Sequence, residues 1–302
     1  MVAEISPGKL MGNVSIPPGK SAFQRACALA LLLNGKTVIT NPGNSNDDMA
    51  ALQIIKAMGA QFHYENNNLV IISTGDIIPA DKINCGESGL SLRMFASIAS
   101  ISGNKTTLIG EGSLLKRPIA FFDEVFPQLG ISVITNNGFL PLEICGPMNP
   151  EDITVDGSGS SQYLTGLLFA FAATARQPVT ITVEDLKSKP YIDLSLQMLN
   201  HFGYRVLNNE YMQFTVLPVQ SMKREIVYHA EGDWSSTSFI LAAGAISGDI
   251  SINGLDMNSV QADRAIMDVL SKAGADIAIK ESRILVSSRN ILNAFEFDAT
   301  DC

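Results

Sequence analysis

Serine, glycine and basic residues gather in four short polar segments of this sequence, each between an expected strand and an apolar helix. The segments read PPGKSAFQR at 17–25, CGESGLSLR at 85–93, DGSGSSQYL at 156–164 and AEGDWSSTS at 230–238. A helix N-terminus presents unpaired backbone N–H groups and a partial positive charge, and both favour an anion. Four such ends that converged on one cleft would bind phosphate and carboxylate groups without a metal.

The serines of these segments have a simpler interpretation. Ser21, Ser158, Ser160 and Ser235 could each be the N-cap of its own helix, because serine is among the preferred N-cap residues. Their recurrence at equivalent positions, next to basic residues, favours a shared anion site over four separate caps.

Several charged residues near these segments are left outside the expected site. Asp47 and Asp48 resemble an N-cap with favourable dipole charge. Arg93 is expected to form an internal ion pair. Glu231 and Asp233 lie near an expected crossing between domains, where a hinge hydrogen bond is the favoured role.

A repeat of about 70 residues would position the four segments. Apolar-periodic helices end at glycines that recur at this spacing, namely Gly59, Gly130, Gly203 and Gly274. Each glycine suits the position after a helix that requires a positive φ, and two short strands around a polar turn follow it. An earlier helix and a β-rich stretch precede it. Each unit therefore reads strand, helix, strand, helix, strand, strand.

Units of this kind predict an α/β fold in two domains, the second of them incomplete. The units run over about 11–75, 82–146, 152–217 and 224–288, and a fifth opens at 295–302. Their apolar helical halves suggest helices buried between sheets. The expected domains are 16–223 as a complete three-unit domain, 224–302 as a partial second domain, and 1–15 as a strand of that second domain.

Length and composition agree with this organisation. A chain of 302 residues suits about two domains, and 46% hydrophobic residues support a large buried core. A net charge of −9 argues against nucleic acid or an anionic membrane as the main partner. The longest apolar runs fall far short of the roughly 18 residues that span a bilayer, and 1–10 has no apolar signal core.

The cysteines and histidines form no recognisable metal site. The cysteines are scattered, with no CxxC pair and no nearby histidine at ligand spacing; they are Cys27, Cys85, Cys145 and Cys302. We therefore expect no metal, reduced thiols and a cytoplasmic location.

Six short motifs resemble those of the 3-phosphoshikimate 1-carboxyvinyltransferases (EPSP synthases), in the same order and across essentially the whole chain. They are Lys20-Ser21 with Arg25, Gly86-Glu87-Ser88-Gly89 with Arg93, Arg117-Pro118-Ile119, GSGSSQYLT at 157–165, SKPYID at 188–193 and EGDWSS at 231–236. One such motif is weak, whereas six in register are specific. The resemblance implies a two-domain inverse α/β barrel of repeated βαβαββ units.

The resemblance also implies which residues bind substrate. Lys20 would contact both substrates and act in catalysis. The residues implied for shikimate 3-phosphate are Lys20, Ser21, Arg25, Ser160, Ser161, Gln162, Ser188 and Tyr191. Those implied for phosphoenolpyruvate are Lys20, Gly89, Arg117 and Gln162. Arg25 and Arg117 would act as guanidinium forks on anions, although Arg117 could also merely cap a helix that begins at Pro118.

The activity implied is transfer of the enolpyruvyl group of phosphoenolpyruvate to the 5-hydroxyl of shikimate 3-phosphate, in the shikimate pathway toward chorismate and aromatic amino acids. The hydroxyl adds to C2 while C3 is protonated, and phosphate then leaves the tetrahedral ketal. This chemistry needs a base, an acid and cations for two anionic substrates. We expect a monomeric transferase without a cofactor that binds neither nucleic acid nor membrane.

The sequence departs from the family pattern in places. The family continues after DATDC with Pro-Asp, whose Asp is the base, and then with further Glu, Lys and Arg residues that bind phosphoenolpyruvate. We therefore expect a C-terminally truncated chain that binds shikimate 3-phosphate weakly and turns over negligibly. Glu87 and Leu90 stand where Asn and Thr are common, and an anionic Glu87 beside a phosphate is unfavourable unless it points away.

Two other functions remain open at this point. The related UDP-N-acetylglucosamine enolpyruvyl transferases share the architecture and the donor, but they typically open with SGAKN and carry a reactive loop cysteine. This chain opens with GKSAFQR and has no cysteine near Gly112 to Leu115. A non-catalytic anion-binding or scaffold protein built from the same repeat is the alternative from another class.

Overall fold

The computed structural model describes residues 4, 6–220, 223–280 and 283–299. Its α-helices are α1 (Lys20–Leu32), α2 (Asn46–Ala57), α3 (Gly89–Ala99), α4 (Phe121–Val125), α5 (Ser161–Thr174), α6 (Lys189–His201), α7 (Trp234–Ser247) and α8 (Ile266–Lys272). Short 3-10 helices are η1 (Gly112–Lys116), η2 (Phe126–Leu129) and η3 (Ala262–Ala265). Among these described residues no helix is both long and apolar enough to cross a bilayer.

The strands of the described residues form four sheets of four strands each. The strands are β1 (Leu10–Ser15), β2 (Gly35–Thr40), β3 (Gln61–Glu65), β4 (Asn68–Ser73), β5 (Lys82–Asn84), β6 (Lys105–Ile109), β7 (Ser132–Asn136), β8 (Phe139–Cys145), β9 (Ile153–Asp156), β10 (Val179–Glu184), β11 (Arg205–Asn209), β12 (Gln213–Leu217), β13 (Glu225–His229), β14 (Gly248–Asn253), β15 (Asp276–Lys280) and β16 (Arg283–Ser287). The sheet orders are β13-β2-β4-β3, β5-β6-β8-β7, β9-β10-β12-β11 and β1-β14-β16-β15.

Every sheet has the same pattern of pairing. In the second sheet β5 pairs parallel with β6, and β8 then pairs antiparallel with both β6 and β7. The other three sheets repeat one parallel and two antiparallel pairings. The predicted α/β repeat is therefore confirmed, and none of the four described sheets closes into a barrel by itself.

The four repeat glycines end their helices as predicted. Gly59, Gly130, Gly203 and Gly274 all have a positive φ, between 74° and 110°. The residue after each glycine donates its N–H to the carbonyl five residues earlier, as from Ala60 to Ile55. This is the Schellman pattern, which satisfies carbonyls at the end of the helix and reverses the chain into the following hairpin.

The first strands of the first and fourth expected units are exchanged. β1 pairs with β14, and β13 pairs with β2, so 11–75 and 224–288 do not each fold as one continuous unit. The prediction of continuous units is wrong here because each of these two strands leaves its own helix at a crossing segment. The two crossings lie beside each other, where the Gly19 N–H donates to the Glu231 carbonyl at 2.7 Å and the Asp233 N–H to the Pro17 carbonyl at 2.9 Å.

The described chain divides into two compact units. Residues 1–19 with 231–302 form the smaller unit, and 20–230 form the larger one. The larger unit ends later than the expected boundary at residue 223, because β13 belongs to its sheet and buries Ile226 there. Glu231 and Asp233 make the two backbone bonds of the crossing, and the Asp233 carboxylate caps α7; their expected hinge role stays a prediction.

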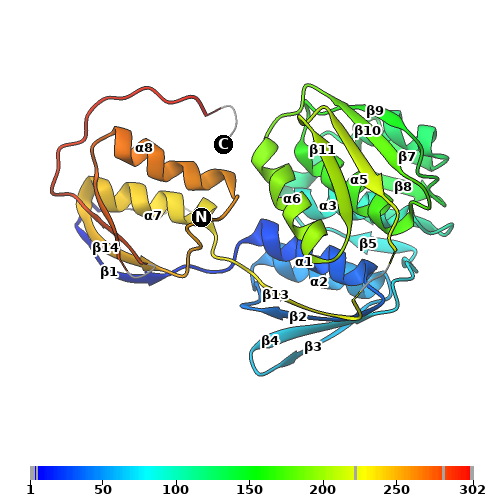
Figure 1. The fold of residues 1–302 in the computed structure, drawn as a ribbon, viewed down its shortest axis with the longest axis horizontal. Coiled ribbons are helices and arrows are strands. Elements are labelled where there is room, and N and C mark those ends of the chain that lie inside the picture. Colours follow the sequence, from blue (N-terminus) through cyan, green and yellow to red (C-terminus); the bar gives the residue numbers. More distant parts are fainter. Residues whose placement is uncertain (1–3, 5, 221–222, 281–282, 300–302) are drawn as a thin grey trace. The chain divides into compact units, whose positions relative to one another are not determined.

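Three helices make the centre of the larger unit. Helices α1, α3 and α5 are buried on nearly all sides, and their largest fully buried apolar side chains are Phe23, Phe95, Phe169 and Phe171. Figure 1 shows α3 and α5 enclosed by strands of this unit. The helices are apolar all round because each faces strands or another helix in every direction.

The smaller unit has its own core, in which α7 lies along the sheet of β1 and β14 (Figure 1). Trp234, Leu241 and Ile252 are fully buried there. The prediction of a buried apolar helix is wrong for the outer face of α7, where Phe239 is 76% and Ile246 70% exposed. The expected strand of a fifth unit is absent from 295–299, and its last three residues, 300–302, lie outside the described part.

Candidate functional site

The candidate site lies at the N-terminal ends of α1, α3, α5 and α6, all within the larger unit. Ser88 caps α3 by accepting the Ser91 N–H at 3.1 Å, and Ser160 caps α5 by accepting the Gln162 N–H at 3.3 Å. Ser188 precedes α6 with a left-handed φ of 55° and makes no side-chain cap bond. These ends carry the unpaired amides and partial positive charge that favour anions.

The N-cap interpretation holds for only one of the four serines to which it was applied. Ser160 is a cap, whereas Ser21 lies inside α1. Ser158 bonds back to the Asp156 carboxylate through both its N–H and its hydroxyl, at 2.8 and 2.9 Å. Ser235 lies inside α7, whose N-cap is Asp233. N-capping therefore does not explain why serine occupies the other three positions.

Arg25 is a fully buried cation held by neutral acceptors. Its Nε donates to the Ser195 hydroxyl at 2.9 Å, its Nη1 to the Ser21 carbonyl at 2.9 Å and its Nη2 to the Tyr191 carbonyl at 3.4 Å. The side chain is 1% exposed, and burial lowers the pKa of the guanidinium to about 10. These bonds tie the start of α1 to α6, so they bring three residues of the implied shikimate 3-phosphate set together.

The Ser195 hydroxyl is itself part of a buried chain of hydroxyls. It donates to the Tyr191 carbonyl at 2.9 Å and lies 2.9 Å from the Thr165 hydroxyl on α5. Sequence reasoning missed both Ser195 and Thr165. The available signal was a polar residue on an apolar helix face, one turn after Tyr191 in the case of Ser195.

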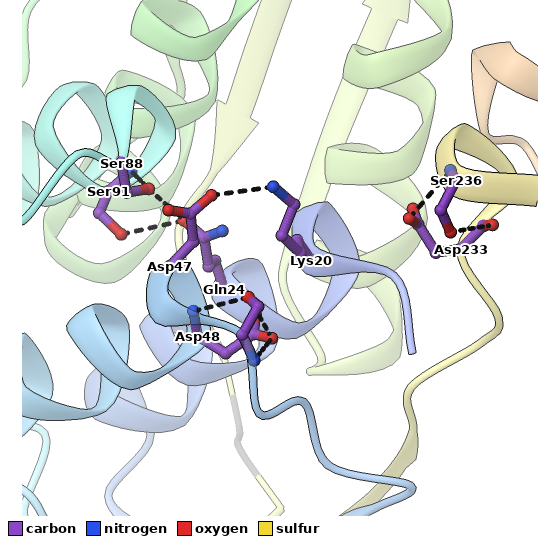
Figure 2. A network of polar contacts seen from close by, with 9 residues as sticks. Lys20, Gln24, Asp47, Asp48, Ser88, Ser91, Asp233 and Ser236 are labelled. Atoms are coloured by element: carbon purple, nitrogen blue, oxygen red, sulfur yellow. Dashed lines mark hydrogen bonds and ion pairs between the residues drawn. The ribbon is translucent and has the colours of Figure 1, made fainter. Parts of the chain in front are cut away.

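Lys20 begins α1 and pairs with an acid that sequence reasoning left outside the site. Its Nζ lies 3.0 Å from Oδ2 of Asp47, in the first turn of α2 (Figure 2). The N-cap of α2 is Ser45, with Asp48 completing a capping box, so neither aspartate is the cap that was expected. Burial raises the pKa of the Asp48 carboxyl, whose bonds from Ser45 oppose the shift.

A buried polar group joins α1 to α3. Oε1 of Gln24 accepts from the hydroxyls of Ser88 and Ser91, at 2.8 and 2.9 Å (Figure 2). Because Gln24 and Ser88 precede Arg25 and Gly89 directly, these bonds set the start of α1 against the start of α3. Figure 2 also shows Asp233 and Ser236, which form the cap of α7 in the smaller unit.

Gly89 and Arg117, both implied for phosphoenolpyruvate, lie against each other. A Cβ built on Gly89 would lie 2.7 Å from Nη1 of Arg117 and 3.2 Å from Nη1 of Arg93. Only glycine therefore leaves these guanidinium groups in place at the start of α3. Arg117 ends the 3-10 helix η1 rather than capping a helix at Pro118, because α4 begins later.

Arg93 does not form the expected internal ion pair within the described residues. Its Nη1 donates to Oε1 of Gln162 at 2.8 Å, and its guanidinium lies 5.1 Å from the centre of the Tyr163 ring. Gln162, implied to span both substrates, is thereby connected to the Gly89 and Arg117 group. The signal that could have revealed this role was a lone charge within an apolar helix.

The remaining residues of the implied set lie at the same helix starts. Ser161 is the buried first residue of α5, and Tyr191 is in the first turn of α6. Glu87, expected to be unfavourable, accepts the Ser113 N–H at 3.1 Å, so its carboxylate is directed to the start of η1. Leu90 is buried in α3.

Basic side chains without a carboxylate partner in the described chain lie at these helix starts. None of Arg25, Arg93 and Arg117 has an ion pair within the described residues, where the four ion pairs all involve lysines. The described part of the chain holds no cluster of His, Cys, Asp and Glu that could bind a metal. Three guanidinium groups and four helix ends can instead neutralise anions directly.

Comparisons with known proteins agree on one family. Residues 5–301 match the family described as EPSP synthase (3-phosphoshikimate 1-carboxyvinyltransferase). The chain is 36% identical to a 3-phosphoshikimate 1-carboxyvinyltransferase of Clostridium perfringens, over 99% of this chain and 70% of that relative. It is 34% identical to the enzyme of the same description from Clostridioides difficile, with the same shares covered.

Solved structures show the same fold. The chain superimposes on an EPSP synthase from Acinetobacter baumannii with a TM-score of 0.79 at 22% identity, covering 97% of this chain and 68% of that one. It superimposes on the enolpyruvyl transferase NikO from Streptomyces tendae with a TM-score of 0.69 at 15% identity. This match covers 92% of this chain and 66% of that one.

Proposed function

The chain belongs to the EPSP synthase family, which comprises enolpyruvyl transferases, and on that premise we propose that its larger unit binds shikimate 3-phosphate and phosphoenolpyruvate at the starts of α1, α3, α5 and α6. The reaction is addition of the 5-hydroxyl to C2 of phosphoenolpyruvate, followed by loss of phosphate. It belongs to the shikimate pathway of aromatic amino-acid biosynthesis.

The observation that carries the proposal is Arg25, a buried guanidinium without an acidic partner among the described residues. A buried charge is costly unless it is paired, and its three neutral acceptors satisfy hydrogen bonds without neutralising the charge. The carboxylate of shikimate 3-phosphate supplies the missing negative charge. Ser21 and Tyr191, which hold Arg25 through their carbonyls, border that end of the ligand.

The phosphate of the same ligand is assigned to serine hydroxyls at the helix ends. Ser160 and Ser161 start α5, and Ser188 starts α6 with its side chain not used as a cap. Hydroxyls and helix-end amides there provide neutral donors to a doubly charged group.

Phosphoenolpyruvate is assigned to the group around Gly89. Arg117 supplies the guanidinium fork for its phosphate, and the glycine allows a backbone N–H to approach. Gln162 and Lys20 lie between the two substrates in this arrangement. Lys20 stabilises the charge that develops on the reacting atoms, once its ion pair with Asp47 is exchanged for substrate.

Isothermal titration with shikimate 3-phosphate tests the proposal on the 302-residue chain. We expect saturable binding of one ligand per chain, lost on substitution Arg25→Met in a protein that remains folded by circular dichroism. If the folded chain does not bind shikimate 3-phosphate at millimolar concentration, only the alternative of a non-catalytic scaffold protein is left.

A phosphate-release assay with both substrates tests the chemistry itself. The expectation of negligible turnover stays a prediction, which the same assay measures. We further propose a cytoplasmic monomer, which light scattering can check. The support for the location is that Cys27, Cys85 and Cys145 are free thiols, as expected in a reducing compartment.

A further inference from the structure

Arg93 is the only charged residue of α3, and it is directed at a residue of the proposed site. The helix reads GLSLRMFASIA and is otherwise buried. Nη1 of Arg93 donates to Oε1 of Gln162 at 2.8 Å, from one central helix to the start of another. The guanidinium also lies 5.1 Å from the centre of the Tyr163 ring, a cation–π distance that holds it in place.

This hydrogen bond determines which way the Gln162 carboxamide points. A guanidinium has five donors and no acceptor, so it can face only the oxygen of the carboxamide. The amide nitrogen must then point away from Arg93, and no hydrogen bond from its two N–H groups is present within the described residues. Both donors are left for a ligand with acceptor oxygens.

The charge of Arg93 is also unpaired. Its Nε is buried and has no hydrogen-bond acceptor among the described residues. Asp156 and Glu124 line a cavity of about 210 Å³ that Arg93 also borders, but neither forms an ion pair with it. Within the described residues this cation therefore has no ion-pair partner.

A second guanidinium faces the same point. The Cβ position of Gly89 is 3.2 Å from Nη1 of Arg93 and 2.7 Å from Nη1 of Arg117. Two like charges at such close range repel each other in a partly buried place, and an anion bound between them relieves that repulsion.

We propose that Arg93 is a positioning residue of this anion site: it orients Gln162 so that both amide N–H groups face the substrates, and it adds a second positive charge beside Arg117. The inference rests on the proposed function, because Gln162 has a ligand to orient only if the chain binds these anions. It gives a role to a residue that sequence reasoning placed in an ion pair.

A double-mutant cycle on the full chain tests the proposal, with shikimate 3-phosphate as the titrant. The variants are Arg93→Met, Gln162→Ala and the two together. Methionine keeps length and packing against Tyr163 but removes every donor. We expect each single substitution to weaken binding by about tenfold, and the double variant to be within about threefold of Gln162→Ala, because both remove one interaction.

Two further variants separate orientation from folding. Arg93→Lys retains a positive charge and N–H donors, and is expected to bind within about threefold of wild type. Gln162→Glu keeps the contact with Arg93, as an ion pair, but has no N–H to offer, so it is expected to bind at least as weakly as Gln162→Ala. Arg176→Met is the matched control, because Arg176 follows the far end of α5, about 20 Å away, and should bind as wild type.

The outcomes are distinguishable. Wild-type affinity in Arg93→Met, or in Gln162→Glu, overturns the inference and leaves the proposed function intact. Multiplied losses of about a hundredfold in the double variant would show that Arg93 acts independently of Gln162, and would overturn its role in orienting Gln162. If the wild-type chain does not bind shikimate 3-phosphate, the proposed function itself is wrong.

Discussion

Arg25 combines two properties that a purely structural residue seldom has. It is buried and charged, and the residues around it offer hydroxyl and carbonyl oxygens rather than carboxylates. The cost of burying the charge is therefore not recovered within the larger unit. Under the proposed function, such an arrangement keeps a guanidinium ready for a carboxylate, at the expense of stability in the free protein.

Substitution Arg25→Met should separate stability from binding. Ser195 keeps its bond to the Tyr191 carbonyl in this variant, so few groups lose their only partner. We expect the free energy of unfolding to be unchanged or up to about 2 kcal/mol higher, while affinity for shikimate 3-phosphate falls at least tenfold. Urea unfolding and titration calorimetry measure the two quantities. A loss of several kcal/mol would instead make Arg25 a structural hub.

Cysteine reactivity is a second test at the scale of single residues. Cys27 and Cys85 are fully buried, and burial raises the pKa of both thiols, that of Cys85 to about 12. The thiolate is the reactive form, so raising the pH from 7 to 9 should not expose either to iodoacetamide in the native protein. Peptide mass spectrometry scores each cysteine separately, with urea-unfolded protein as the positive control. Rapid native labelling at pH 9 would contradict the burial.

Helix starts are the elements that build the candidate site. Gln24 joins α1 to α3 through Ser88, and Arg25 joins α1 to α6 through Ser195. The capping box of α2 also places Asp47 against Lys20. The site is therefore formed where these helices begin, and side-chain hydrogen bonds between them hold it.

Asp47 should compete with anionic ligands for Lys20. We expect Asp47→Asn to tighten shikimate 3-phosphate binding by about two- to threefold at low salt, with little change in stability because the pair is partly exposed. The gain should disappear at high salt, where screening weakens both interactions. Glu225→Gln is the matched control, since it breaks the Lys36 pair at 3.1 Å elsewhere in the unit. Equal gains in both variants would point to net charge alone.

At the scale of the molecule, the exchange of β1 and β13 defines the two units. The larger unit takes its fourth strand of the first sheet from 225–229, and the smaller unit takes one from 10–15. The larger unit therefore contains three complete sheets and the buried central helices. A domain boundary placed before β13 would remove the strand that pairs parallel with β2.

Two fragments test this boundary. Residues 20–230 should fold alone, whereas 20–223 should be less stable by roughly 2–4 kcal/mol, because it loses the burial of Ile226 and the hydrogen bonds of β13 to β2. Urea unfolding followed by circular dichroism compares them. Equal stability would mean that β13 contributes nothing to the larger unit.

Local patterns in the sequence determined much of this protein. The repeat glycines, the apolar helices and the strand hairpins were predictable because positive φ, helical periodicity and turn chemistry depend on neighbours in the chain. The motifs around Lys20, Arg117 and Ser160 likewise indicated the family before any contact was known.

Only the tertiary structure decided which distant groups meet. The partners of Lys20, Arg25 and Arg93 lie 27, 170 and 69 residues away, and sequence spacing carries no information about such pairs. The exchange of β1 and β13 has the same origin, because an edge strand can pair with any compatible sheet that the connecting segments let it reach. Local chemistry specified the elements and the kinds of group at their ends, and packing between elements selected their partners.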